Sequence, residues 1–238
     1  NDALEYIEKS LVKGMHNLKA RTLKSALLRK LGKNADATEF AKETLNIDAL
    51  DHSAYYELYK LTGNGLDEMQ AVMRGDNHNY IELALSYMTA YLTEDAIEIL
   101  KLAPNDNEPM VHYYLYALTN DKSELDKAEN SDSLYCFPNR LEDITVLEKA
   151  IYNGGNYAAY YLGCLFYDKG RWEESKELWE KCADNIKLPT VYRNLSLVYY
   201  NKLKDGVLAL KAMEKAFSID KSDARIFFEL DQLFELLS

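Results

Sequence analysis

The fold is decided by the stretch YYLGCLFYDKGRWEESKELWEKC, which runs from Tyr160 to Cys182. Its apolar and small residues recur every three or four positions on both sides of Gly170, and this spacing is typical of amphipathic helices. Glycine readily takes the positive φ that ends a helix, so the first helix is expected to stop at Gly170. The stretch therefore predicts two helices joined by a tight turn.

The same helical hairpin returns downstream at a fixed distance. Ala209 and Ala216 stand 34 residues after Ser175 and Cys182, which are the small residues of the second helix. A fixed period of this length indicates a repeat protein, in which each hairpin leaves apolar surface for the next hairpin to cover.

This pattern resembles the tetratricopeptide repeat (TPR), a helix–turn–helix unit of 34 residues. Counted from Asn156, its characteristic positions hold Leu162, Gly163, Phe166, Ser175, Trp179 and Cys182. Counted from Asn77, they hold Tyr80, Leu83, Ala84, Tyr87, Ala96, Leu100 and Ala103, with Pro109 one place late. The resemblance implies an all-α fold, a right-handed α-solenoid of antiparallel helix pairs whose first helices line a concave groove.

We expect a single TPR-like solenoid over residues 1–238. The repeat from Pro189 carries one extra residue in its turn, residues 129–140 are predicted to be an insertion, and residues 224–238 a terminal half-repeat. The clearest repeats are predicted at residues 77–110, 156–188 and 189–223.

The remaining segments fit the repeat more loosely. Residues before Leu18 predict a leading helix, a first repeat begins near Leu18, and residues 53–74 predict a hairpin shorter than the full period. The segment from Cys136 to Arg140 could reach over the groove or pack on its own repeat, and both alternatives stay open.

The bulk composition excludes several classes of protein. The chain carries 28 Lys and Arg against 39 Asp and Glu, a formal net charge of −11, whereas binding to nucleic acid needs clustered positive charge. No stretch approaches the roughly 20 apolar residues of a membrane span. We therefore expect neither a nucleic-acid nor a membrane partner.

The three cysteines show no spacing typical of metal ligands. Cys136, Cys164 and Cys182 are an odd number, which favours unpaired thiols in a reducing compartment. They are predicted to be small apolar core residues, and the location is predicted to be cytoplasmic. A signal segment removed from the chain stays open as an alternative.

No motif of an enzyme or cofactor site is found. The chain lacks GxGxxG, a P-loop, GxSxG and HExxH, and its histidines are scattered, with no second ligand three or four residues away that would build a metal site. Those histidines are His16, His52, His78 and His112. We expect a protein that is not an enzyme, with no catalytic residue, no metal site and no cofactor.

The resemblance assigns groove-facing positions to the first helix of each repeat. Transferred to this chain, these positions hold several residues that we expect to bind a partner, and Asn194 lies beside them. The predicted partner-binding residues are Tyr157, Tyr160, Tyr167, Arg193, Asn194, Tyr200, Asn201 and Arg225. Tyrosine offers a large contact area, and Arg and Asn offer directional donors, as on recognition surfaces. The same residues could instead be contacts between helices or solvated side chains. The Lys, Asn and Arg set by which some TPR proteins hold a C-terminal carboxylate is not reproduced.

Two hypotheses about function follow. The first is a non-catalytic interaction or scaffold module that binds a peptide or a partner domain in its concave groove. The alternative is the C-terminal helical region of a larger bacterial TPR protein, which could be carbohydrate-active and whose active domain would lie outside this chain. A homodimer formed through the terminal half-repeat also stays open.

Overall fold

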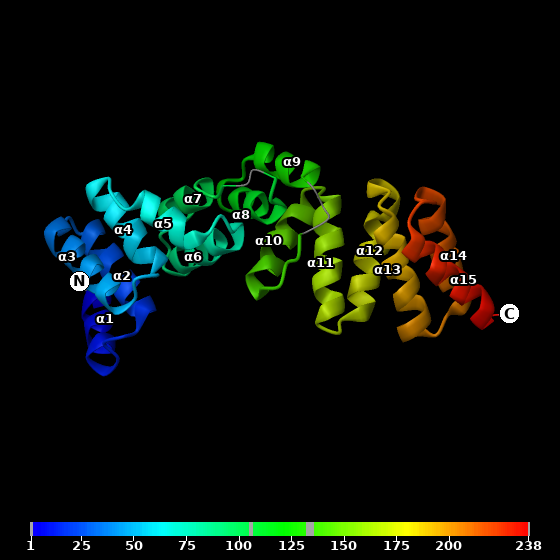
Figure 1. The fold of residues 1–238 in the computed structure, drawn as a ribbon, viewed down its shortest axis with the longest axis horizontal. Helices are drawn as coiled ribbons and strands as arrows, with labels where there is room; N and C mark the ends of the chain where they lie inside the picture. Colours follow the sequence, from blue (N-terminus) through cyan, green and yellow to red (C-terminus); the bar gives the residue numbers. More distant parts are fainter. Residues whose placement is uncertain (1, 105–106, 132–135, 238) are drawn as a thin grey trace. The chain divides into compact units, whose positions relative to one another are not determined.

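The computed structural model of the chain describes residues 2–104, 107–131 and 136–237. Within these residues the chain forms fifteen α-helices and no strand, which confirms the predicted all-α fold (Figure 1). The helices are α1 (Asp2–Lys13), α2 (Leu18–Lys30), α3 (Asn34–Ile47), α4 (His52–Thr62), α5 (Leu66–Met73), α6 (Asn77–Thr89), α7 (Thr93–Lys101), α8 (Pro109–Thr119), α9 (Lys122–Asn130), α10 (Leu141–Tyr152), α11 (Asn156–Asp168), α12 (Trp172–Ile186), α13 (Pro189–Val198), α14 (Gly206–Ile219) and α15 (Ala224–Leu237). A π-helical turn, η1 (Tyr199–Leu203), continues α13.

The helices group into two compact units. Unit 1 spans residues 1–106 with α1 to α7, and unit 2 spans residues 107–238 with α8 to α15. Consecutive helices pack as antiparallel pairs, for example α6 with α7 in unit 1 and α11 with α12 in unit 2. Helix α10 lies against both α8 and α11. The single solenoid over residues 1–238 stays a prediction.

The predicted repeat starts coincide with helix starts. Helices α6, α11, α13 and α15 begin at Asn77, Asn156, Pro189 and Ala224, and α2 begins at Leu18. Gly170 has a φ of 76° and ends the first helix of its pair, as the sequence predicts. The hairpin of α4 and α5 is short, also as predicted.

The extra residue of the repeat from Pro189 does not lie in the turn between the helices. The structure places it at the end of α13, where η1 widens the helix and the N–H of Asp205 donates to the carbonyl of Tyr199 at 2.9 Å. A π-helical turn holds one residue more than an α-helical turn, so the helix itself absorbs the insertion.

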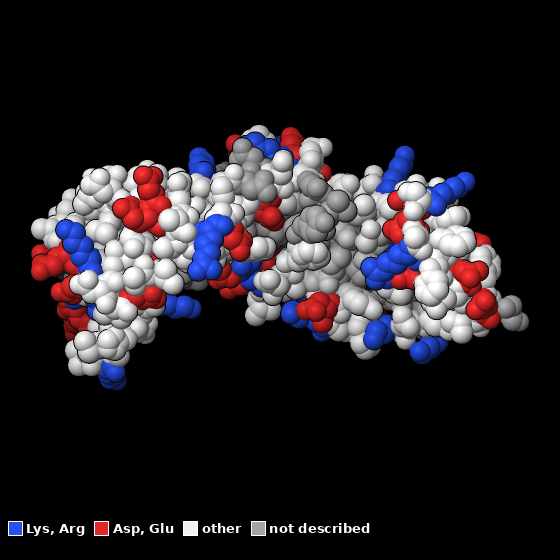
Figure 2. All heavy atoms as spheres, viewed as in Figure 1, with Lys and Arg blue, Asp and Glu red and all other residues white. Residues whose placement is uncertain are grey.

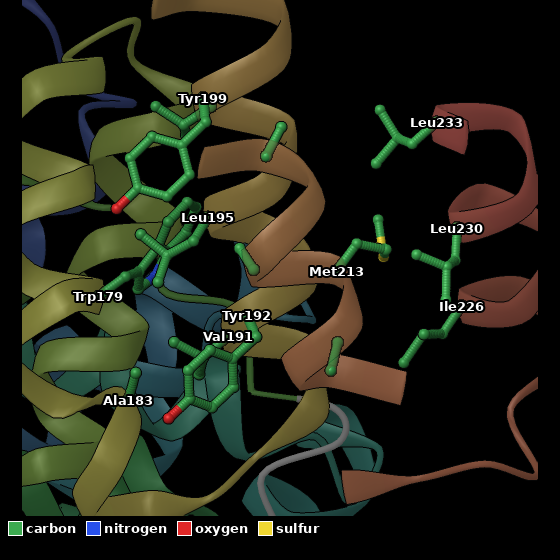
Figure 3. Packing of buried hydrophobic residues seen from close by; sticks show 14 of the residues in the cluster. Trp179, Ala183, Val191, Tyr192, Leu195, Tyr199, Met213, Ile226, Leu230 and Leu233 are labelled. Carbon is green, nitrogen blue, oxygen red and sulfur yellow. The ribbon is translucent and has the colours of Figure 1, made fainter. Parts of the chain in front are cut away.

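A hydrophobic core of unit 2 is shared by α11 to α15 (Figure 3). Trp179 of α12, Leu195 of α13 and Met213 of α14 are buried in it, and Met213 faces Ile226 and Leu230 of α15. Each hairpin is thus closed by the next one, which is the packing that a helical repeat requires.

The predicted insertion is fixed at both ends by carboxylates. Glu129 still belongs to α9, and its carboxylate accepts the N–H groups of Asn156, Tyr157 and Ala158 at 2.8 to 3.1 Å, so it caps the N-terminus of α11. Asp143 of α10 accepts the N–H groups of Asn139 and Arg140 at 2.9 and 3.0 Å.

The described part of the insertion packs on its own unit. Cys136 and Pro138 are buried, whereas Phe137 between them is exposed. This arrangement favours the second of the two alternatives for the segment from Cys136 to Arg140. Residues 132–135 lie outside the described residues.

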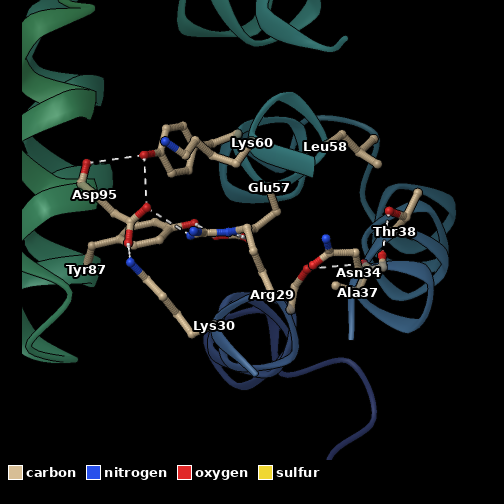
Figure 4. A network of polar contacts seen from close by, with 12 residues as sticks. Arg29, Lys30, Asn34, Ala37, Thr38, Glu57, Leu58, Lys60, Tyr87 and Asp95 are labelled. Carbon is tan, nitrogen blue, oxygen red and sulfur yellow. Dashed lines mark hydrogen bonds and ion pairs between the residues drawn. The ribbon is translucent and has the colours of Figure 1, made fainter. Parts of the chain in front are cut away.

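Unit 1 is held by a buried network of charges (Figure 4). Arg29 of α2 donates to both carboxylate oxygens of Glu57 in α4, at 2.7 and 3.0 Å, and to Asp95 of α7 at 2.9 Å. The hydroxyl of Tyr87 donates to Glu57 at 2.7 Å, and Lys30 pairs with Asp95 at 2.9 Å. Burial would raise the pKa of Asp95, but the hydrogen bond and charge of Lys30 and the charge of Arg29 lower it. Side chains distant in sequence therefore join four helices of the unit, α2, α4, α6 and α7.

Candidate functional site

The histidines and carboxylates do not gather into a metal site. Among the described residues, no group of three or more His, Cys, Asp or Glu side chains could hold a metal ion. His112 lies buried, with its Nδ1 2.7 Å from Glu124. None of the described helices combines the length and apolar character needed to span a bilayer.

A pocket of about 110 Å³ lies between the first helices of two consecutive repeats in unit 2. Tyr167 and Cys164 contribute from α11, and Asn194 and Leu197 contribute from α13. Trp179 of α12 forms the remaining wall. The pocket unites two of the predicted site residues, Tyr167 and Asn194.

The walls of this pocket are uncharged and mostly apolar. The Trp179 indole N–H already donates to the Tyr160 carbonyl at 3.1 Å, and the Trp179 ring lies 5.8 Å from that of Tyr167. Burial raises the pKa of the Cys164 thiol to about 12, so this group stays protonated at neutral pH. The side-chain amide of Asn194 forms no hydrogen bond with any residue that the structure describes, and it is free to contact a ligand.

The two predicted arginines are held by one carboxylate. Arg193 donates from Nε and Nη2 to the two oxygens of Glu229 in α15, each at 2.6 Å, and Arg225 donates from Nε to the same carboxylate at 3.2 Å. Arg193 therefore ties α13 to α15. Glu229 is not among the predicted site residues, although it lies four residues after Arg225, the spacing at which opposite charges pair on a helix.

Tyr157 and Tyr160 lie half-buried on α11 and contact other rings. Their centroids lie 6.4 and 5.4 Å from that of the buried Tyr161. Burial raises the pKa of the Tyr160 hydroxyl. These contacts favour a packing role for both residues, which is one of the alternatives that the sequence leaves open.

Tyr200 and Asn201 lie on the π-helical turn that follows α13. Tyr200 is half-buried against the core of unit 2, and Asn201 is exposed. Single π-helical turns occur frequently at functional sites. Neither residue lines the pocket.

The face of the molecule shown in Figure 2 carries no large patch of a single charge among its described residues. On the face that Figure 2 shows, basic and acidic side chains of the described residues occur in small mixed groups over each unit. No stripe of basic side chains crosses the described part of this face, although binding to a nucleic-acid backbone would need one.

The chain was compared with known protein families and with solved structures. No protein-family model matches the chain. Solved structures of TPR proteins match it over nearly its whole length. YrrB, a TPR protein with an unusual peptide-binding site, is 14% identical, with 96% of this chain and 99% of that chain covered and a TM-score of 0.35.

Two further solved structures are similar to the same degree. TTC0263, a thermophilic TPR protein from Thermus thermophilus, is 14% identical, with 91% of this chain and 98% of that chain covered and a TM-score of 0.37. MamA is 20% identical, with 84% of this chain and 96% of that chain covered and a TM-score of 0.34. The fold assignment itself rests on the helix pairs and their period.

Proposed function

We propose that unit 2 is a non-catalytic binding module that takes a peptide, or an extended segment of a partner protein, on the face formed by α11 and α13. The observation that carries this proposal is the pocket between these helices. It includes Tyr167, at a position that the resemblance assigns to the groove, and Asn194, which lies beside such positions. Binding pockets are typically concave and mostly apolar, with a few polar groups that orient the ligand.

The composition of this face supports a protein ligand. Tyr167 offers aromatic surface, which dominates the binding energy of many protein interfaces, and the Asn194 amide offers both a donor and an acceptor. The net charge of −11 disfavours a nucleic acid. A cytoplasmic location belongs to the same proposal, supported by three cysteines that are free thiols.

The test is a selection from a random peptide library displayed on phage, with the whole chain as bait. A selected peptide is then synthesised, and its affinity is measured by fluorescence anisotropy. We expect Tyr167→Ala and Asn194→Ala each to weaken binding by about tenfold, the effect of losing roughly 1.4 kcal/mol.

Glu177→Ala is the matched control, because Glu177 is exposed on α12 away from the pocket lining. Arg193 is unsuited to this test, since its replacement would also loosen α15. Enrichment of no peptide, or equal affinity of the pocket variants and the control, would contradict the proposal.

A second candidate is a helical scaffold for another domain of a larger bacterial protein. The exposed phenylalanines of α15 favour it, because Phe227 and Phe228 are each 58% exposed and Phe234 is 48% exposed. Contiguous exposed apolar surface usually marks a contact with another protein or domain. Mass spectrometry of the protein from its native cells tests this candidate, and a mass equal to that of the present chain would contradict it.

A further inference from the structure

We infer that the pocket between α11 and α13 takes one aliphatic side chain, the size of Val, Leu, Ile or Met, from an uncharged stretch of peptide. This inference rests on the proposed function and names its ligand class. It excludes two other kinds of anchor, an aromatic ring and a charged group.

The size of the pocket argues against an aromatic anchor. Its volume is about 110 Å³, whereas an apolar cavity of roughly 150 Å³ is known to hold benzene. A phenyl or indole group would be too large for a pocket of this volume to enclose, and two of the walls are the large rings of Tyr167 and Trp179. Trp179 is 1% exposed and is fixed by its hydrogen bond to Tyr160, so it has little room to move.

The chemistry of the walls argues against a charged anchor. The lining holds two aromatic rings, the Leu197 side chain, a thiol with a raised pKa and one amide. A carboxylate or ammonium group placed there would lose its hydration without meeting an opposite charge, which is costly.

The nearest predicted cation does not change this conclusion. Arg193 precedes Asn194 on α13, but both of its bonded nitrogen atoms point to Glu229. The Arg193 and Glu229 side chains are 13% and 19% exposed, so their pairing is largely shielded from water. An acidic ligand would have to displace a carboxylate that already makes two short hydrogen bonds in a fixed geometry.

An aliphatic side chain meets none of these objections. It would gain roughly 25 cal/mol for each Å² of apolar surface that the pocket removes from water. The Asn194 amide at the pocket wall could then pair with the main chain of the ligand, which suits many sequences. Selectivity would come from the size of the pocket rather than from charge.

The test titrates the whole chain with four capped amino acids while nuclear magnetic resonance follows the side-chain N–H signals of Asn194 and Trp179. The probes are the N-acetyl amides of leucine, methionine, tryptophan and aspartic acid. We expect the leucine and methionine probes to shift both signals to saturation. The tryptophan and aspartic acid probes should bind about tenfold more weakly, a ratio typical of discrimination by an apolar pocket.

Variants connect the binding to this pocket. Leu197→Phe adds bulk to the pocket wall and should abolish the shifts, whereas Leu236→Phe adds the same bulk on the exposed end of α15 and should leave them unchanged. Circular dichroism checks that both variants fold. Asn194→Ala adds no bulk. It should lower the affinity for the leucine probe, and the Trp179 signal still reports that binding.

Two results would overturn the inference. The first is equal or tighter binding of the tryptophan or aspartic acid probe, and the second is the absence of any shift with the leucine probe. The peptide selection described above decides the proposed function separately. Selected peptides that depend on an acidic or aromatic anchor would leave that function standing and overturn only the inference about its ligand.

Discussion

Gly163 of α11 lies directly against Trp179 of α12. A Cβ atom at this position would collide with the indole of Trp179, whose Cδ1 would be only 2.6 Å away. The Ser175 hydroxyl donates to the Gly163 carbonyl at 2.8 Å, which fixes the contact further. A residue with no side chain is therefore required at the small position of this repeat.

We predict that Gly163→Ala lowers the free energy of unfolding by up to about 2 kcal/mol. Alanine favours a helix over glycine by roughly 1 kcal/mol, but forcing a methyl group into a packed core costs about 1 to 3 kcal/mol and displaces a buried indole. Urea denaturation followed by tryptophan fluorescence measures the change, because both tryptophans, Trp172 and Trp179, lie in α12.

Gly14→Ala is the control for this prediction. The nearest atoms to a Cβ at Gly14 are 4.0 Å away, so this substitution should change the stability by less than about 0.5 kcal/mol. Equal unfolding midpoints for Gly163→Ala and the unchanged protein would show that Trp179 can move aside without loss.

At the scale of elements, α15 is attached to unit 2 in two ways. Ile226, Leu230 and Leu233 bury one side of it in the shared core, and Glu229 bonds to Arg193 of α13. The bond between α13 and α15 uses Arg193, a side chain that the sequence predicts to bind a ligand. Helix α15 thus has a polar anchor in addition to its apolar face.

We predict that Glu229→Ala weakens the attachment of α15 by about 2 kcal/mol, because hydrogen bonds to a charged group contribute roughly 1.5 to 3 kcal/mol. Hydrogen exchange of the α15 amides should accelerate accordingly. Gln232→Ala, on an exposed side of the same helix, should leave the exchange unchanged. Unaltered protection in Glu229→Ala would mean that the apolar face alone holds the helix.

The extent to which sequence could predict these elements depends on how local their signals are. Gly170, Pro189 and the small residues at a period of 34 predict helix starts and ends correctly, because each acts within a few residues. The π-helical turn could not be located, since one extra residue fits equally well into a turn or a helix. The network of Arg29 depends on partners 28 and 66 residues away, which leave no local pattern.

The residues of the candidate site also differ in whether a local sequence pattern predicts their role. The repeat predicts Tyr167 at a groove position and Asn194 beside one, and the structure brings both to one pocket. Trp179 is predicted to be a core residue, and it is buried in the core while also forming a wall of the pocket. The sequence could not show that Arg193 bonds to another helix rather than to a ligand, because its partner, Glu229, lies 36 residues away on α15.

At the scale of the whole molecule, buried tyrosines are common to both units. In unit 1 the hydroxyl of Tyr87 donates to Glu57, and in unit 2 that of Tyr114 donates to Asp143 at 2.6 Å. Burial and the neighbouring carboxylate charges raise the pKa of both hydroxyls. For Tyr192 of unit 2, burial and the hydrogen bond to Asp184 raise the pKa to about 12.

These raised pKa values predict loss of stability at alkaline pH. A tyrosine in the unfolded chain ionises near pH 10, whereas these folded tyrosines stay neutral until a higher pH. Their contribution is therefore complete below about pH 10 and is lost as the pH rises towards the folded-state pKa. The free energy of unfolding should fall by up to about 1.4 kcal/mol per pH unit for each such tyrosine.

The measurement follows tyrosinate absorbance and helix content together as the pH is raised. We expect part of the 19 tyrosines to ionise while the helices remain, and the rest to ionise in a steep second step that coincides with the loss of helical circular dichroism. Tyr192→Phe should reduce the pH dependence above pH 10, because one group that resists ionisation in the folded state is removed. Tyr152→Phe is the control, since Tyr152 is 91% exposed. Ionisation of all the tyrosines in one step with the helices intact would contradict the structure, because buried hydroxyls bonded to carboxylates cannot ionise before the fold opens.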